Sequence, residues 1–286
     1  MNYKKLLKPL QKSSIRIAYD AIGACSIGSS KIGGKPDLPS DFQWPHYHSK
    51  IDSTVAGIYP LGFLAQINCE EVHKYDSDSL LPPKGLLYFF YELDTMKWGF
   101  DPQDKGCARV YYHPGEVSEL VRTEFPLDLP RENQLPEIPV TFTAKNELPT
   151  FDEFSELHNE ESQDWDAYEK VKTEMGFDSD LAYDTDQSIT KLLGYADVVQ
   201  NSMLLECEHV TNGIYCGESI EIPKDTLHQH KENCIKWQLL FQLDSIFIED
   251  KEIMMWGDMG RLFYYIKADD LKNVEFDNCW LILQCG

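Results

Sequence analysis

Long apolar runs are missing from this 286-residue chain, in which no stretch of 18 or more apolar residues occurs. A transmembrane helix needs about 20 such residues, so the sequence predicts no membrane span. Residues 1–9 include three lysines but lack the apolar core of a signal peptide. We therefore expect a cytoplasmic protein.

Basic residues are also scarce. The chain has 26 Lys and Arg against 48 Asp and Glu, which gives a formal charge of −22 and a pI near 4.6. Nucleic acids and anionic membranes bind clustered Lys and Arg, so this charge argues against both as partners. It permits a basic protein partner or a metal ion, and it leaves the oligomeric state open.

Familiar catalytic motifs are absent as well. The sequence contains no P-loop, no Gly-x-Gly-x-x-Gly and no His-Glu-x-x-His. The segment 24–28 approaches the nucleophile elbow of hydrolases, but Ala24 replaces the first glycine and no apolar strand leads directly into the segment. We assign no catalytic residue, and whether the protein is an enzyme stays open.

The chain has eight cysteines and no secretion signal, which favours free thiols or metal ligands over disulfides. One region carries the residue types of a zinc site, and its candidate ligands are Cys207, Cys216, His228, His230 and Cys234. Eight residues separate the first two cysteines, whereas zinc knuckles use a shorter spacing. The alternative is an ordinary surface loop with exposed histidines, and no cofactor is established.

Short apolar and aromatic segments bounded by Gly and Pro predict strands. We expect them at 15–19, 60–67, 85–91, 108–113 and 140–143. Many aromatic strand signals with few long helices indicate an α+β fold built mostly from antiparallel sheets.

Residues 151–186 differ from the rest because they hold thirteen Asp and Glu against two Lys. Apolar residues at helical spacing predict two short helices with solvated acidic faces, within 151–157 and 165–175. Thr150 and Glu153 form a capping box for the first. We interpret the segment of about 150–186 as an acidic helical insertion, and we expect a further helix over 189–193.

Two segments resemble each other. Phe63–Asn68 precedes Gly85, and Leu239–Asp244 precedes Gly260. The glycine follows Gln66 by nineteen residues and Gln242 by eighteen, and a similar aromatic run follows each glycine. The matched order raises the hypothesis of an internal pseudo-duplication, with repeats at about 55–115 and 235–286. Two such units would pack face to face, with a crevice between them for a ligand.

Three glutamines end apolar triplets: Gln66, Gln242 and Gln284. A buried amide must find hydrogen-bond partners, either in a ligand or in neighbouring backbone. The segment Trp256–Arg261 is the sharpest local motif, with two glycines that permit a tight turn. Asp258 and Arg261 could pair across that turn, or they could bind a polar ligand together with the glutamines.

Several motifs together resemble the YwqG-like family of bacterial proteins of unknown function. They are Gly33-Gly-x-Pro36, Phe63–Gln66, Gly85-x-Leu-Tyr-Phe-Phe90, Leu192-Leu-Gly-Tyr195, Trp256-Gly-Asp-x-Gly260 and Leu283-Gln-Cys285. The resemblance covers most of the chain and implies one YwqG-like domain over 1–286 in a soluble bacterial protein. It supplies no catalytic residues.

These observations lead to two hypotheses of function. The first is a non-catalytic acidic module, like an immunity or inhibitor protein, which binds a basic partner. The alternative is an enzyme or small-ligand binder that uses the crevice between the pseudo-repeats, lined by Asp258, Arg261 and the three glutamines. A structural zinc ion is compatible with either.

Overall fold

The structure is a computed structural model that describes residues 2–52, 55–158, 164–179, 189–218 and 220–286. Within these ranges the chain forms seven α-helices and 17 strands, and every pairing between strands is antiparallel. The expected α+β class with mostly antiparallel sheets is therefore confirmed.

The larger sheet has six strands in the order β11-β1-β12-β13-β16-β17. Their bounds are Thr141–Glu147, Lys12–Ala18, Lys191–Leu193, Trp237–Asp244, Arg261–Lys267 and Trp280–Gln284. The smaller sheet has five strands in the order β10-β2-β6-β7-β8. These span Ile138–Pro139, Lys31–Ile32, Gly62–Asn68, Leu86–Tyr91 and Ala108–His113.

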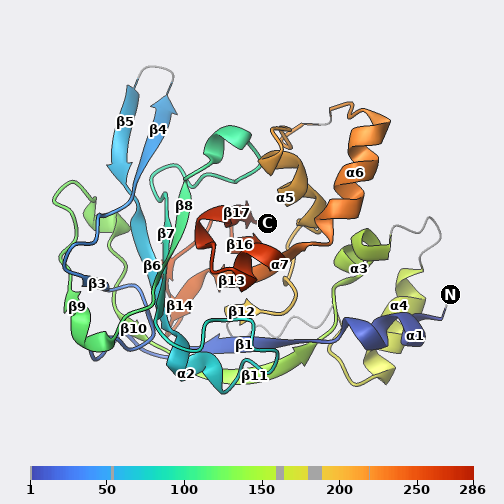
Figure 1. Cartoon of the computed structure of the whole chain (residues 1–286), viewed down its shortest axis with the longest axis horizontal. Helices are drawn as coiled ribbons and strands as arrows, with labels where there is room; N and C mark the ends of the chain where they lie inside the picture. The colour runs from blue at the N-terminus through green and yellow to red at the C-terminus, as the bar shows by residue number, and fades with distance from the viewer. Residues whose placement is uncertain (1, 53–54, 159–163, 180–188, 219) are drawn as a thin grey trace.

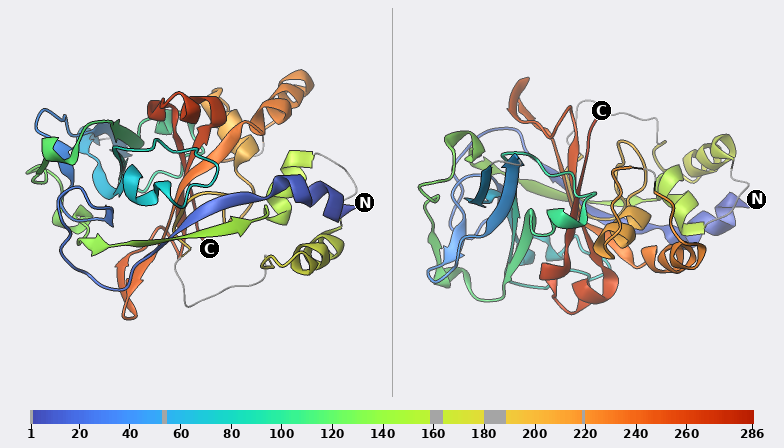
Figure 2. Two further views of the ribbon diagram at one scale, coloured as in Figure 1. Left: turned by 60° about the horizontal axis from the view of Figure 1, so that its bottom comes forward. Right: turned by 90° about the horizontal axis from the view of Figure 1, so that it is seen from above.

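Three two-stranded pairs lie outside these sheets: β3 (Asp37–Pro39) with β9 (Leu120–Arg122), β4 (His46–Asp52) with β5 (Val55–Pro60), and β14 (Ile246–Ile248) with β15 (Lys251–Met254). The helices are α1 (Tyr3–Leu7), α2 (Cys69–His73), α3 (Phe151–His158), α4 (Trp165–Glu174), α5 (Leu204–Thr211), α6 (Lys224–Cys234) and α7 (Ala268–Lys272). Helices α1, α3 and α4 gather at the end of the molecule that carries the N-terminus (Figures 1 and 2).

The main core lies where the two large sheets meet. The ring of Phe89 on β7 is 4.3 Å from that of Phe241 on β13 and 5.3 Å from that of Tyr264 on β16, centroid to centroid. The Tyr264 hydroxyl donates to the carbonyl of Phe90 at 3.0 Å. Aromatic contacts thus join the sheets, and a hydrogen bond satisfies the one polar atom that this packing buries.

The alternation of side chains along β16 explains how the larger sheet is covered on its other face. Tyr264 belongs to the core between the sheets, whereas its neighbours Phe263 and Tyr265 pack in a second cluster with α5 and α6. Successive strand residues point to opposite faces, so an apolar strand such as this one must be buried on both. A third, smaller cluster joins α1, α3 and α4.

All five strand segments expected from the sequence contain strands, and both acidic helices are present. The helix expected over 189–193 is wrong, because Lys191–Leu193 form β12 between β1 and β13. Leu193 and Gly194 have φ values of +60° and +76°, which no right-handed helix accepts. Hydrogen bonds to the two neighbouring strands therefore outweigh the local helix propensity of residues 189–193.

The acidic faces of α3 and α4 are less solvated than expected. Glu153 and Glu169 are buried, and Glu156 accepts from the hydroxyl of Ser202 at 2.6 Å and from the backbone N–H of Leu205 at the start of α5. Thr150 caps α3 by accepting from the N–H of Glu153, as the capping box predicts.

Across the described part of the chain, none of the helices has the length and apolar character needed to span a bilayer.

Candidate functional site

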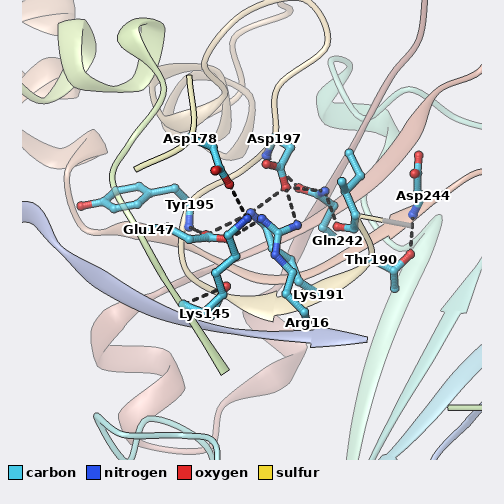
Figure 3. Close-up of polar contacts among 12 residues, drawn as sticks. Arg16, Lys145, Glu147, Asp178, Thr190, Lys191, Tyr195, Asp197, Gln242 and Asp244 are labelled. Carbon is cyan, nitrogen blue, oxygen red and sulfur yellow. Dashed lines mark hydrogen bonds and ion pairs between the residues drawn. The ribbon is translucent and has the colours of Figure 1, made fainter. Parts of the chain in front are cut away.

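A cluster of buried and half-buried charged residues lies around Lys191 in the larger sheet (Figure 3). The Lys191 ammonium is 2.6 Å from Asp197 Oδ2 and 3.0 Å from Glu147 Oε2. Arg16, on the neighbouring strand β1, reaches Glu147 Oε1 at 2.6 Å and Asp197 Oδ2 at 3.4 Å. Gln242 donates to Asp197 Oδ2 at 3.0 Å. We call these five residues the Lys191 network.

Electrostatics inside the network favour the ionised form of Asp197. Burial opposes ionisation of Asp197, but the nearby Lys191 and Arg16 outweigh it and lower the pKa of that carboxyl to about 2. The network contains two basic side chains and two carboxyl groups, so its formal charge is zero.

The smaller sheet holds a second cluster of the same composition. The Lys31 ammonium lies 3.0 Å from Glu137 Oε2 and 3.7 Å from Asp37 Oδ2. Arg122 contacts both carboxylates, Asp37 at 2.5 Å and Glu137 at 2.8 Å. Gln66 donates to Asp37 Oδ2 at 2.8 Å. These five residues form the Lys31 network, which is neutral as well.

The two networks match in their backbone geometry. Lys31 is the strand partner of Gln66, and Lys191 is the strand partner of Gln242. In both strands the register shifts just before the glutamine, between Phe63 and Ala65 and between Leu239 and Phe241. In each network the aspartate follows the lysine by six residues.

The glutamine amides bind their loops in the same way. Gln66 accepts from the N–H of Asp37 at 2.8 Å and donates to the carbonyl of Ser29 at 2.8 Å. Gln242 accepts from the N–H of Asp197 at 2.9 Å and donates to the carbonyl of Ile189 at 2.8 Å. Each amide therefore ties together the chain before and after its lysine.

The turn after each lysine requires glycine. Gly34 has φ +68° and Gly194 has φ +76°. A Cβ at Gly34 would lie 2.6 Å from Glu137 Oε2, and one at Gly194 would lie 2.5 Å from Glu147 Oε2. Both the dihedral angle and the approach of the carboxylate exclude a side chain at these positions.

The remaining predicted ligand-binding residues do not meet in one crevice. Gln284 accepts from the N–H groups of Val199 and Gln200 at 3.1 Å, so its amide serves the chain's own backbone like the other two. Asp258 is exposed in the turn after Trp256. Arg261 pairs with Asp244 at 3.3 Å and donates to the carbonyl of Asp197 at 2.8 Å, so the expected Arg261–Asp258 pairing is wrong.

The predicted zinc ligands are spread over two helices and a loop. Cys207 is buried on α5, His230 and Cys234 are buried on α6, and Cys216 lies in the loop between these helices. His228 is exposed and faces Glu232 at 3.3 Å. The alternative of an ordinary surface loop with exposed histidines does not describe this region, because α5 and α6 pack on the larger sheet.

No group of three or more His, Cys, Asp or Glu side chains in the described ranges is arranged to hold a metal ion. Burial raises the pKa of the Cys216 and Cys234 thiols to about 11, which disfavours the thiolate that zinc binds. The Nδ1 atom of His230 instead lies 2.6 Å from that of His209, a residue that the sequence did not single out. The zinc site stays a prediction.

The described residues line at least two surface grooves. The first, of about 470 Å³, is lined by residues that include Cys25, Glu71, Lys74 and Tyr75. Burial, and then the charge of Glu137, raise the pKa of the Cys25 thiol, so this cysteine is a poor nucleophile. The second groove, of about 500 Å³, lies between β8 and residues 274–278 and contains Tyr111 and Tyr112.

Comparison with known proteins places the chain in a family. Residues 30–285 match the family described as Domain of unknown function (DUF1963), and the chain belongs to it. No curated protein matches the sequence.

Proposed function

We propose that this member of the family is a non-catalytic binding module that recognises a basic protein through its acidic surface. The location of the net charge carries this proposal. Both networks are formally neutral, because they pair four of the chain's Lys and Arg residues with four carboxylates. The charge of −22 must therefore lie outside them.

The exposed side chains support the same conclusion. In the described ranges, exposed carboxylates outnumber exposed Lys and Arg side chains roughly two to one. They occur in all parts of the chain, including the β14–β15 hairpin and the region after α7, and are not confined to 151–186. A field of one sign steers a partner of the opposite charge and speeds association.

Partner capture from the lysate of the source organism tests the proposal. The immobilised protein is incubated with the lysate at low and at high salt, and the retained proteins are identified. Calorimetry then measures the affinity of the purified partner at both salt concentrations. We expect a basic protein whose affinity falls with salt. Capture of acidic or neutral proteins alone, with affinity indifferent to salt, would contradict the proposal.

A matched pair of variants assigns the contribution of the acidic helices. Asp166→Asn with Glu174→Gln removes two exposed charges from α4, and Asp250→Asn with Glu252→Gln removes two from the β14–β15 hairpin. If residues 151–186 contribute most of the attraction for the partner, only the α4 double variant should weaken binding. Equal losses would mean that the whole surface acts together.

We also propose three narrower assignments. The motifs from Gly33 to Cys285 support a YwqG-like member of the family, and the eight free cysteines support a cytoplasmic location. The matched register, bulges and glutamine contacts of the two networks support a single domain that arose by internal duplication.

A further inference from the structure

We propose that the groove beside β8 is where an extended, basic segment of the partner binds. This inference rests on the proposed function. It specifies where on the molecule the partner binds and that the bound segment is extended. The groove runs between strand β8 and a short 3-10 turn, Phe276–Asn278, that follows α7. The other groove contains both Lys74 and Glu71 and therefore favours no single charge in a ligand.

The groove lies along the open edge of the smaller sheet. Strand β8 is the last strand in the sheet order, and its pairing with β7 is the one ladder that it forms within the described ranges. Tyr111 and Tyr112 both line the groove, although successive strand residues point to opposite faces. The groove therefore straddles the strand edge, where an added strand would find unpaired backbone groups.

A ring contact and a hydrogen bond hold the groove wall in place. The rings of Tyr112 and Phe276 are 5.8 Å apart, and the Tyr112 hydroxyl donates to the carbonyl of Lys84 at 2.9 Å. Phe276 is buried, so it anchors its neighbours Glu275 and Asp277, which are exposed at the groove. A preformed wall lowers the entropy that a ligand loses on binding.

The chemistry of the lining selects a cation. The residues that line the groove include two tyrosines, Glu275, Asp277 and Asn278, and none of its lining residues is Lys or Arg. The Asn278 amide donates to Glu275 Oε2 at 3.4 Å and to Asp270 Oδ1 at 2.9 Å. Arg109, which precedes Tyr111 by two residues on β8, acts against Asp277 at the Tyr111 hydroxyl and has the larger effect there. The selection of a cation therefore depends on Glu275 and Asp277 away from that hydroxyl. An arginine can stack on a phenol ring while it pairs with a carboxylate. Every second residue of an extended ligand would reach the same face.

A blocked six-residue peptide that alternates arginine with threonine is a suitable probe, and the same peptide with citrulline in place of arginine is its neutral control. We expect the arginine peptide to bind at low salt and to shift the amide resonances of Tyr111, Tyr112 and Phe276. The Glu275→Gln, Asp277→Asn variant should weaken binding about tenfold, because both counter-charges are lost. The Asp250→Asn, Glu252→Gln variant removes an equal number of charges outside the groove. It should weaken binding of the arginine peptide by less than about twofold.

Equal weakening by the two variants, or resonance shifts that avoid β8, would overturn the groove assignment and leave the acidic binding surface in place. Equal binding of the citrulline peptide would also overturn the assignment, because it would mean that charge is not recognised. If the arginine peptide does not bind but a captured basic partner does, the groove is wrong and the proposed function stands. If neither binds, both fail.

Discussion

The Lys31 and Lys191 networks share their lysine, aspartate and glutamine but differ in the origin of their other two charges. Glu147 and Arg16 come from adjacent strands of the larger sheet, β11 and β1. Arg122 comes from β9, which pairs with β3 outside the smaller sheet. The strand register therefore determines the shared part, and any nearby element can supply the neutralising pair.

The lysine contacts differ accordingly. Lys191 lies 2.6 Å from its aspartate, whereas Lys31 lies 3.7 Å from Asp37 and donates to the carbonyl of Lys35 at 2.6 Å. In the Lys31 network the contact of Arg122 with Asp37, at 2.5 Å, is the close one. Neutrality is preserved in both, since an unpaired buried charge is costly.

Removal of either lysine should have the largest effect. Lys191→Met and Lys31→Met each leave one buried and one half-buried carboxylate with a single cation, and we expect a loss of about 3–5 kcal/mol in the free energy of unfolding. The loss for Lys31 should be the smaller of the two, because Arg122 lies within 2.8 Å of both of its carboxylates, whereas Arg16 lies 3.4 Å from Asp197. Urea denaturation measures both values.

Lys170→Met is the control, because Lys170 is exposed on α4 and should change stability by less than about 0.5 kcal/mol. A cost below about 1 kcal/mol at Lys191 would show that the network does not stabilise the fold.

The sequence revealed the glutamines of the two networks but not their charges. Apolar runs around Gln66 and Gln242 predict strands directly, and the similar spacing to Gly85 and Gly260 suggests a repeat. The lysines were missed because Lys is rarely buried. A Lys-x-x-Gly-x-x-Asp pattern at 31–37 and 191–197 would have identified them. Their arginine and glutamate partners are far away in sequence, and no local pattern indicates them.

Glu153 and Asp197 lie in different surroundings, so protonation of these two carboxyl groups should change the stability of the fold in opposite directions. Burial raises the pKa of Glu153 from 4.5 to about 7, against the attraction of Lys12, and Oε2 of Glu153 has no hydrogen-bond partner among the described residues. The neutral form therefore stabilises the fold at low pH, and this stabilisation is lost as the pH rises towards 7. Asp197, with its lowered pKa, loses its contribution only as the pH falls from about 4 towards 2.

Glu153→Gln should therefore be more stable than wild type by about 2 kcal/mol at pH 8, with little difference at pH 4. Thermal unfolding of both proteins across this range measures the difference. A constant difference between the two proteins at every pH would exclude titration of Glu153 as the cause.

Substitution of the glycines should give the smallest changes in the free energy of unfolding. These substitutions compare the turns of the two networks directly. Gly34→Ala and Gly194→Ala should each cost about 2 kcal/mol, from the left-handed backbone and from contact with Glu137 or Glu147. Gly176→Ala shares the left-handed φ, +86°, but meets no atom within 4 Å and should cost about 1 kcal/mol. Equal costs at all three positions would mean that the carboxylates move aside freely.

The rate of association with the captured partner, measured against ionic strength, tests the central claim most directly. With its internal charges neutralised, the protein presents its negative charge to solvent, so the rate constant should fall at least about tenfold between low and near-physiological salt. Dissociation should change much less. An association rate that does not depend on salt would contradict the account, because the acidic surface would then have no part in recognition.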